Sequence, residues 1–222
     1  MGYRTLRAGS IAGNHHRPQL EQGEATQTLP QMRVGVFGGS FNPIHTGHIN
    51  LGLSLCKQGK VDELWFVVSP LNPLKQSCTD LLADEARLHL AQLAVETHPQ
   101  LHVCDIEMHL PRPSYMVDTL SELRKQNPDD ELVLVIGADN WLRFPQWRNS
   151  QEIMRHHRLL IYPRPGYDID VSTLPSGVQM VKTPLFDISS TQIRQAIAAG
   201  NYHGRGLNPR VWKEIKQNKY YL

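Results

Sequence analysis

Cysteine is scarce in this sequence, and the few cysteines stand far apart. Cys56, Cys78 and Cys104 are the only ones in 222 residues, and they form no C-x-x-C pair. Because a disulfide framework or a zinc ribbon needs more and closer cysteines, the sequence argues against both. We therefore expect reduced thiols and a cytoplasmic location.

Long hydrophobic runs and a marked excess of charge are also lacking. The best apolar runs, Leu64–Val68 and Leu132–Ile136, are much shorter than the roughly 18 residues that a membrane helix needs. The chain has 23 Lys and Arg against 21 Asp and Glu, which leaves a formal charge of only +2. A surface dedicated to nucleic acid would need a clear basic excess, so we expect neither membrane nor nucleic-acid partners.

The apolar content is nevertheless high enough for a folded domain, since hydrophobic residues make up 40% of the chain. Residues 1–31 differ from the rest, because their apolar positions are scattered and they lack the apolar core of a secretory signal. Arg4, Arg7 and Arg17 suit a transit peptide, whereas Glu21 and Glu24 argue against one. We predict a disordered or artefactual extension over 1–31 and a folded domain over 32–222 that ends in a small helical part.

From residue 33 onward, short apolar strands alternate with helical patterns. This alternation predicts an α/β protein with a Rossmann-like, doubly wound parallel sheet and helices on both faces. The expected strands are Val34–Phe37, Leu64–Val68, Leu101–Ile106, Leu132–Ile136, Arg158–Tyr162 and Val178–Val181. The expected helices are Thr46–Lys57, Asp84–Thr97, Tyr115–Gln126, Ser190–Ala199 and Val211–Asn218.

A first candidate site follows the first strand and spans Gly38–His48. Gly38 and Gly39 let the backbone approach a phosphate, and the helix that follows offers its positive N-terminus. His45 and His48 lie one helical turn apart, so both imidazoles can face the same ligand. Turn glycines, half a metal site and a surface histidine pair are the alternatives, and the combination of features in one string favours a phosphate site.

A second candidate site, Ile188–Arg194, lies at the start of a later helix. Ser189 is a suitable N-cap, and Gln192 three residues later predicts a capping box. Capping leaves Arg194 unexplained, because it lies one turn into the helix on the same face as Ser190. A hydroxyl, helix N–H groups and a guanidinium at one place suit the β- and γ-phosphates of a nucleotide.

A third candidate site follows the apolar strand Leu132–Ile136. Gly137 again allows close approach to a ligand, and Asp139 either caps the next helical turn or contacts that ligand. Trp147 closes an F-x-x-W string that begins at Phe144, and it is either a core residue or a stacking surface for an aromatic ring.

Together these strings resemble the nucleotidyltransferase superfamily, with its H-x-G-H and I-S-S-T-x-I-R motifs, and in particular bacterial nicotinate mononucleotide adenylyltransferases. Pro113–Leu120 is similar to that family's P-S-Y-T-x-x-T-L stretch, and Arg164–Tyr167 matches its R-P-G-Y loop. The resemblance covers 33–222 and implies catalytic residues His45, His48 and Arg194. It implies ATP contacts at Gly38, Gly39, Ser40, Phe41, Gly137, Asp139, Ile188, Ser189 and Ser190. It implies acceptor contacts at Asn42, Lys75, Tyr115, Met116 and Trp147.

Two positions depart from the family pattern. Leu74 stands where the family often has histidine in P-P-H-K, although Lys75 is kept and is expected to bind phosphate. Met116 stands where threonine is usual, so a backbone contact to the acceptor survives while a hydroxyl contact does not. The acceptor half of the site is therefore less closely matched than the triphosphate half.

The resemblance implies transfer of AMP from ATP to nicotinate mononucleotide, giving nicotinate adenine dinucleotide (deamido-NAD) and pyrophosphate in NAD biosynthesis. Mg²⁺ is expected to arrive with ATP, and no metal site built from side chains is expected. The alternatives are nicotinamide mononucleotide or phosphopantetheine as acceptor, a non-catalytic nucleotide sensor, and an RNA-binding module. A homo-oligomer is possible.

Overall fold

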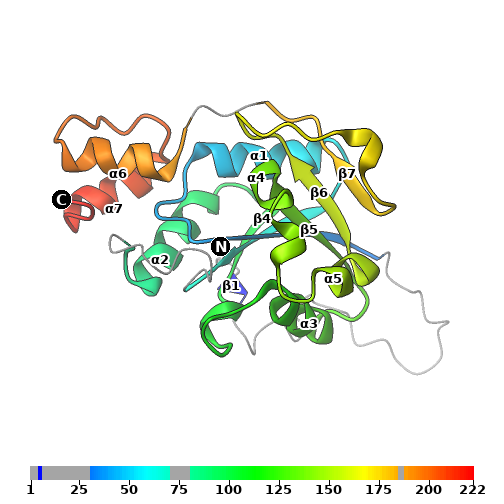
Figure 1. Cartoon of the computed structure of the whole chain (residues 1–222). Helices are drawn as coiled ribbons and strands as arrows, with labels where there is room; N and C mark the ends of the chain where they lie inside the picture. The colour runs from blue at the N-terminus through cyan, green and yellow to red at the C-terminus, as the bar shows by residue number, and fades with distance from the viewer. Residues whose placement is uncertain (1–4, 7–30, 71–80, 185–187) are drawn as a thin grey trace, which may run out of the picture.

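The computed structural model describes residues 5–6, 31–70, 81–184 and 188–222, and within these ranges seven strands form one parallel sheet (Figure 1). The strand order is β1-β4-β3-β2-β5-β6-β7. The strands are β1 (Thr5–Leu6), β2 (Arg33–Gly39), β3 (Glu63–Val68), β4 (Leu101–Cys104), β5 (Glu131–Gly137), β6 (Arg158–Tyr162) and β7 (Val178–Met180). The α-helices are α1 (Thr46–Lys57), α2 (Asp84–Val95), α3 (Met116–Gln126), α4 (Ala138–Trp141), α5 (Ser150–His156), α6 (Ser190–Ala198) and α7 (Pro209–Gln217). Short 3₁₀ helices are η2 (Ile106–Met108), η3 (Phe144–Gln146) and η4 (Val171–Thr173).

The sheet is covered on both faces, which is why its central strands are apolar throughout. In β3, Leu64, Phe66 and Val68 point into one core, and Trp65 and Val67 point into the other. Helices α1, α2, α6 and α7 contribute to the first core, and α3 and α5 to the second. Helices α6 and α7 lie together at the end of the molecule opposite β6 and β7 (Figure 1).

The order of the strands reverses direction between β2 and β5. From β2 the chain continues to β3 and β4 on one side, and from β5 it continues to β6 and β7 on the other. In such a doubly wound sheet the ligand crevice opens at the carboxyl ends of the two strands where the order reverses. The predicted fold class is therefore confirmed, and the first and third candidate sites both lie at this point.

Apart from shifted element ends and short additional elements, the clearest differences from the expected pattern concern β4 and α5. The strand expected to reach Ile106 ends at Cys104, and Ile106 instead begins η2, fully buried. The helix α5 was not expected, because it has only seven residues and buries only Ser150 and Ile153, too few for an apolar period to be recognised. None of the helices in the described ranges has the length and apolarity to cross a membrane.

Within the segment expected to be irregular, the backbone of Thr5–Leu6 pairs in parallel with Val103 and Cys104 of β4. The remaining residues up to Pro30 lie outside the described ranges. The division into an extension over 1–31 and a domain over 32–222 stays a prediction.

Candidate active site

The two histidines of the first motif lie at the N-terminus of α1. His45 is the N-cap residue, and its N–H donates to Nδ1 of His48 at 3.2 Å. The two imidazole rings stack with centroids 3.7 Å apart and planes inclined by 24°. The spacing therefore brings both rings to one place, as predicted, although only His48 lies within the helix.

His45 is held in an uncharged form by its surroundings. Its side chain is only 5% exposed, and burial, aided by the positive charge of Arg164, lowers the pKa of His45 to about 4. Its Nδ1 is buried. The His45 side chain faces the N–H of His48, since the two residues form a reciprocal capping box at the start of α1.

The glycines of the motif allow close packing around the loop. A Cβ on Gly38 would come within 2.6 Å of the Met116 side chain, and a Cβ on Gly47 would come within 3.0 Å of the His45 ring. Phe41 has a positive φ of 44°, and its ring packs edge-on against His48, with centroids 5.1 Å apart. The predicted nucleotide residue Phe41 therefore supports a histidine from within the core.

The second motif lies directly against the first. Ser189 caps α6 as predicted, accepting from the N–H of Gln192 at 3.2 Å. Ser190 Oγ donates to the carbonyl of Pro43 at 2.9 Å, and Arg194 Nη1 donates to the carbonyl of Asn42 at 2.9 Å. Two hydrogen bonds thus join strings that lie more than 140 residues apart in the sequence. The bonded residues are separated by 147 and 152 positions.

A further contact between these regions was not foreseen. The N–H of Thr46, at the start of α1, donates to the carbonyl of Gly206 at 2.9 Å. Gly206 has a φ of +86°, and a Cβ there would collide with the Ile188 side chain. The loop before α7 therefore uses one N–H of α1 that had been expected to face the ligand, and no local sequence signal marks this contact.

A cavity of about 140 Å³ lies beside the first motif, at the carboxyl ends of the central strands. It is lined by four of the predicted site residues, namely Gly38, Tyr115, Met116 and Trp147. Trp147 is half-buried and packs against Phe144, with centroids 5.3 Å apart, while the indole also borders the cavity. The core and stacking interpretations of Trp147 are therefore compatible.

Asp139 and Arg164 face each other across the ends of β5 and β6. Asp139 lies in the first turn of α4, where a carboxylate complements the positive end of the helix. Its Oδ1 lies 3.6 Å from Nε of Arg164, and both atoms are buried without a hydrogen-bond partner in the described ranges. The Arg164 guanidinium also lies over the Tyr162 ring, 5.3 Å from its centroid. The pair is positioned to bind a polar ligand.

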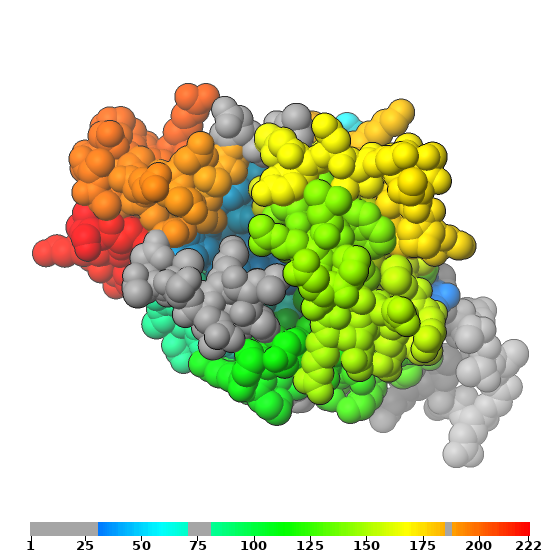
Figure 2. Space-filling model, viewed as in Figure 1, coloured from blue at the N-terminus to red at the C-terminus, as the bar shows by residue number. Residues whose placement is uncertain are grey.

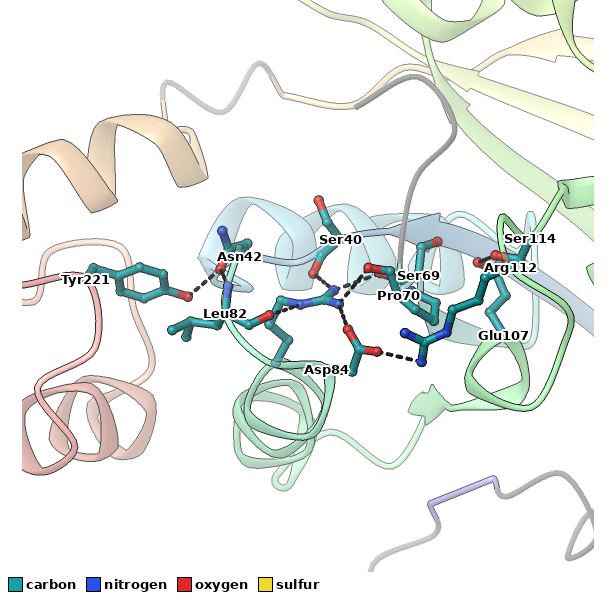
Figure 3. Close-up of polar contacts among 11 residues, drawn as sticks. Ser40, Asn42, Ser69, Pro70, Leu82, Asp84, Glu107, Arg112, Ser114 and Tyr221 are labelled. Atoms are coloured by element: carbon teal, nitrogen blue, oxygen red, sulfur yellow. Dashed lines mark hydrogen bonds and ion pairs between the residues drawn. The ribbon is translucent and has the colours of Figure 1, made fainter. Parts of the chain in front are cut away.

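Two predicted acceptor residues lie apart from this group. Asn42 is buried, and its Oδ1 accepts from Tyr221 Oη at 2.9 Å and from the N–H of Leu82 at 3.3 Å (Figure 3). Asn42 does not line the cavity, so its side chain has a structural role in this loop. Lys75 lies outside the described residues.

The cavity also contains a carboxylate that the sequence did not reveal. Glu107 is 3% exposed, and its two oxygens accept from Ser114 Oγ at 2.7 Å and Thr119 Oγ1 at 2.9 Å. These bonds hold both sides of the α3 N-terminus, where Tyr115 and Met116 lie. No spacing or motif distinguished Glu107 from an ordinary surface glutamate.

The surface view agrees with a recessed site. Blue atoms, from the part of the chain around β2 and α1, are seen set back between the orange segment of α6 and the yellow and green segments (Figure 2). In the described ranges no three His, Cys, Asp or Glu residues cluster closely enough to hold a metal ion. The histidines at the start of α1 and Arg194 of α6 are groups that suit anions.

Comparison with known proteins shows the family to which the chain belongs. A family model described as cytidylyltransferase-like matches residues 36–196. A relative from Bacteroides fragilis, named probable nicotinate-nucleotide adenylyltransferase, is 47% identical over 189 residues, covering 85% of this chain and 94% of the relative. A relative of the same name from Bacteroides thetaiotaomicron is 46% identical over 187 residues, covering 84% and 92%.

The fold is shared with a solved structure of low sequence identity. That structure, Plasmodium falciparum nicotinic acid mononucleotide adenylyltransferase complexed with NaAD, matches with a TM-score of 0.74 at 18% identity, covering 86% of this chain and 98% of that one. The family match spans both histidines and the α6 motif, and the relatives cover most of the chain. The chain therefore belongs to the cytidylyltransferase-like family, in the group that holds the nicotinate-nucleotide adenylyltransferases.

Proposed function

We propose that this chain is a nicotinate-nucleotide adenylyltransferase that transfers AMP from ATP to nicotinate mononucleotide, forming deamido-NAD and pyrophosphate for NAD synthesis. The observation that carries the proposal is the junction of two phosphate motifs beside an aromatic-lined cavity. Ser190 and Arg194 of α6 bind the loop that leads to His45 and His48. The cavity is lined by Gly38, near the end of β2, from which this loop leaves the sheet.

We assign the triphosphate to the face formed by α1 and α6. His45, His48 and Arg194 supply donors around the N-termini of the two helices, where a partial positive charge favours phosphate. His45 is neutral in the free protein because burial lowers its pKa to about 4, and a bound triphosphate would raise that pKa again. These donors gain strength as negative charge grows on the leaving pyrophosphate.

We assign the pyridine ring of the acceptor to the cavity. Trp147 offers an aromatic face, and the N-terminus of α3 at Met116 offers backbone N–H groups for the nicotinate carboxylate. Glu107 holds this helix start through Ser114 and Thr119. The ring and the triphosphate then lie on either side of Gly38 and Gly39, where the acceptor phosphate can approach the α-phosphorus.

The reaction needs no protein nucleophile. The acceptor phosphate is already an anion, so it attacks the α-phosphorus in line, and the new P–O bond forms as the bond to pyrophosphate breaks. Burial raises the pKa of Cys56 to about 11 and that of Cys104 to about 12, which keeps both thiols protonated at neutral pH. Catalysis then consists of positioning and stabilisation of charge.

A divalent metal ion belongs to the reaction as part of the nucleotide substrate, and we propose Mg²⁺. The described residues offer no cluster of three metal ligands, whereas Mg²⁺ is commonly held by phosphate oxygens and water. Asp139 is the side chain that we assign to contact with this ion, because its Oδ1 is buried without a hydrogen-bond partner in the described ranges. The ion would neutralise charge on the triphosphate.

The test is pyrophosphate release from ATP and Mg²⁺ with nicotinate mononucleotide, nicotinamide mononucleotide and phosphopantetheine offered separately. We expect strong turnover with the nicotinate compound. Turnover only with another acceptor would change the acceptor assignment, and ATP binding without any pyrophosphate release would contradict the enzyme activity and favour a nucleotide sensor.

We also propose a cytoplasmic location, supported by the isolated cysteines and by the nucleotide substrates. Assembly into a homo-oligomer stays a prediction, which light scattering of the purified chain at several concentrations would test.

A further inference from the structure

Arg87 of α2 is the largest fully buried side chain in the described part of the protein, and it is a cation. A guanidinium has five N–H donors, and all five of these meet an oxygen atom. The acceptors are the carbonyls of Leu82 (3.0 Å), Ser40 (2.6 Å), Ser69 (2.8 Å) and Pro70 (3.3 Å) and the Oδ1 of Asp84 (2.6 Å). Figure 3 shows these partners converging from three separate segments.

The position of these acceptors connects Arg87 to the reaction. Ser40 directly follows β2, in the loop that leads to the two histidines. Ser69 and Pro70 directly follow the neighbouring strand β3, and Ser69 lines the cavity assigned to the acceptor. One nitrogen, Nη1, donates to Ser40 and to Ser69 at the same time, so it bridges the triphosphate side and the acceptor side.

The same loop is held at a second point. Asn42 Oδ1 accepts from the N–H of Leu82 at 3.3 Å and from Tyr221 Oη at 2.9 Å. The carbonyl of Leu82 also accepts from Arg87, which in turn donates to Ser40. Ser40 and Asn42 are therefore both held against the start of α2 and the residues just before it (Figure 3). Asn42 in turn offers its carbonyl to Arg194 of the second motif.

Stability alone is a poor explanation for such a residue. Burial lowers the pKa of Arg87 from its ordinary value, and the hydrogen bond to Asp84 and the charge of that residue oppose the effect. A buried ion pair is often no more stabilising than apolar residues of the same size, and its benefit is then a defined geometry. The planar fork, with donors in fixed directions, defines geometry better than a flexible lysine.

We propose that Arg87 is a positioning residue for the transfer reaction, which holds the loop after β2 and the end of β3 at the separation that in-line attack requires. This inference rests on the proposed adenylyltransferase activity. Arg87 does not touch the substrates in this arrangement. It acts through the backbone of Ser40 and Ser69, and a small misplacement of reacting groups is enough to cost a large part of the rate.

Arg33 provides a matched control at the opposite end of the same two strands. It lies at the start of β2 and, like Arg87, joins a carbonyl and a carboxylate, donating to Gly59 at 2.6 Å and to Asp62 at 2.6 and 3.2 Å. Both R87K and R33K keep the charge and lose the fork. Only R87K disturbs the carboxyl ends of the strands, where the site lies.

The experiment measures kcat, the KM values of both substrates and the melting temperature for the wild type, R87K and R33K, with assays well below each melting temperature. For R87K we expect kcat to fall about 10- to 100-fold with KM values changed less than about threefold. For R33K we expect kcat to stay within about twofold of the wild type. A kcat of R87K within about twofold of the wild type, or a rise confined to the KM of ATP, would overturn the proposal.

Further outcomes distinguish failure of the role of Arg87 from failure of the proposed adenylyltransferase activity. Turnover by the wild type and R33K establishes the activity, so a loss in R87K concerns Arg87 alone, whereas inactivity of all three contradicts the proposed function itself. If R87K does not fold, D84N takes its place, because it weakens one arm of the fork. D84N should lower kcat more than R112Q, which removes only the 2.8 Å bond from Arg112 to Asp84 Oδ2. Equal kcat values for D84N and R112Q would then overturn the role.

Discussion

The two halves of the candidate site are built in different ways. The triphosphate half consists of two contiguous strings, and polar side chains of one bind backbone carbonyls of the other. The acceptor half is a cavity whose walls come from the ends of β2, β3 and β5, the segment around η2 and the start of α3, and the residues 146–148. The first half is polar and made of two pieces, while the second is largely apolar and made of many.

This difference follows from what each half has to recognise. A triphosphate carries several charges, so a helix N-terminus and a few donors at fixed local spacing are sufficient. A planar ring needs surfaces above, below and around it, and these come from distant parts of the chain. We therefore expect substitutions in the triphosphate half to affect the rate most, and substitutions in the acceptor half to affect acceptor binding.

The largest effect is expected for His48→Ala in the triphosphate half. Removing one donor to developing negative charge costs about 100- to 1000-fold in kcat at comparable sites. The matched control is His156→Ala, because His156 is an exposed histidine at the end of α5. Steady-state kinetics and thermal unfolding would be measured for both variants. An unchanged kcat in His48→Ala would contradict its assignment.

The pH dependence of folding is expected to depend on His45. Its folded-state pKa is lowered to about 4 from 6.5, so between these values the unfolded chain binds more protons and the free energy of unfolding rises with pH. The full shift corresponds to about 3 kcal/mol, present above pH 6.5 and lost as the pH falls to 4.

Urea unfolding at several pH values between 4 and 7, for the wild type and His45→Asn, tests this dependence. The variant should show a shallower rise. Some rise should remain, since burial also lowers the pKa of His157. Identical slopes for the two proteins would show that His45 is not the group responsible.

In the acceptor half, Trp147→Ala should raise the KM of nicotinate mononucleotide about 10- to 100-fold, because stacking of a base on an aromatic ring is worth about 1–3 kcal/mol. The KM of ATP should hardly change. Trp147→Phe keeps an aromatic face and should lose less. Equal losses of ATP and acceptor binding would show that the two halves are not separable at this residue.

The smallest effect is expected for Met116→Thr. A threonine hydroxyl adds a donor in the cavity, which should lower the KM of nicotinate mononucleotide by about fivefold at most. This limit corresponds to the contribution of about 1 kcal/mol that one hydrogen bond makes. Met180→Thr on β7 is the control, since Met180 does not line the cavity. A higher KM in Met116→Thr would mean that the methionine side chain itself contributes to acceptor binding.

Much of the fold could be predicted from local patterns. Helix α1 begins and ends at the predicted residues, and β6 does so as well, because Thr46–Lys57 and Arg158–Tyr162 have clear boundaries in the sequence. Ser189 was predicted as an N-cap, and the structure confirms it. The short helix α5 could not be predicted, since so few of its residues are buried that no period emerges.

The chain itself determined the strand and helix pattern, the glycines after β2 and the two phosphate motifs, because these depend on neighbouring residues and their spacing. Only the tertiary structure decided which groups meet. It joined Arg194 to Asn42, directed the side chain of Asn42 away from the cavity, and placed Glu107 and Arg87 at the site. The physical reason is that a buried polar side chain is defined by the distant acceptors it must satisfy, and local sequence does not specify them.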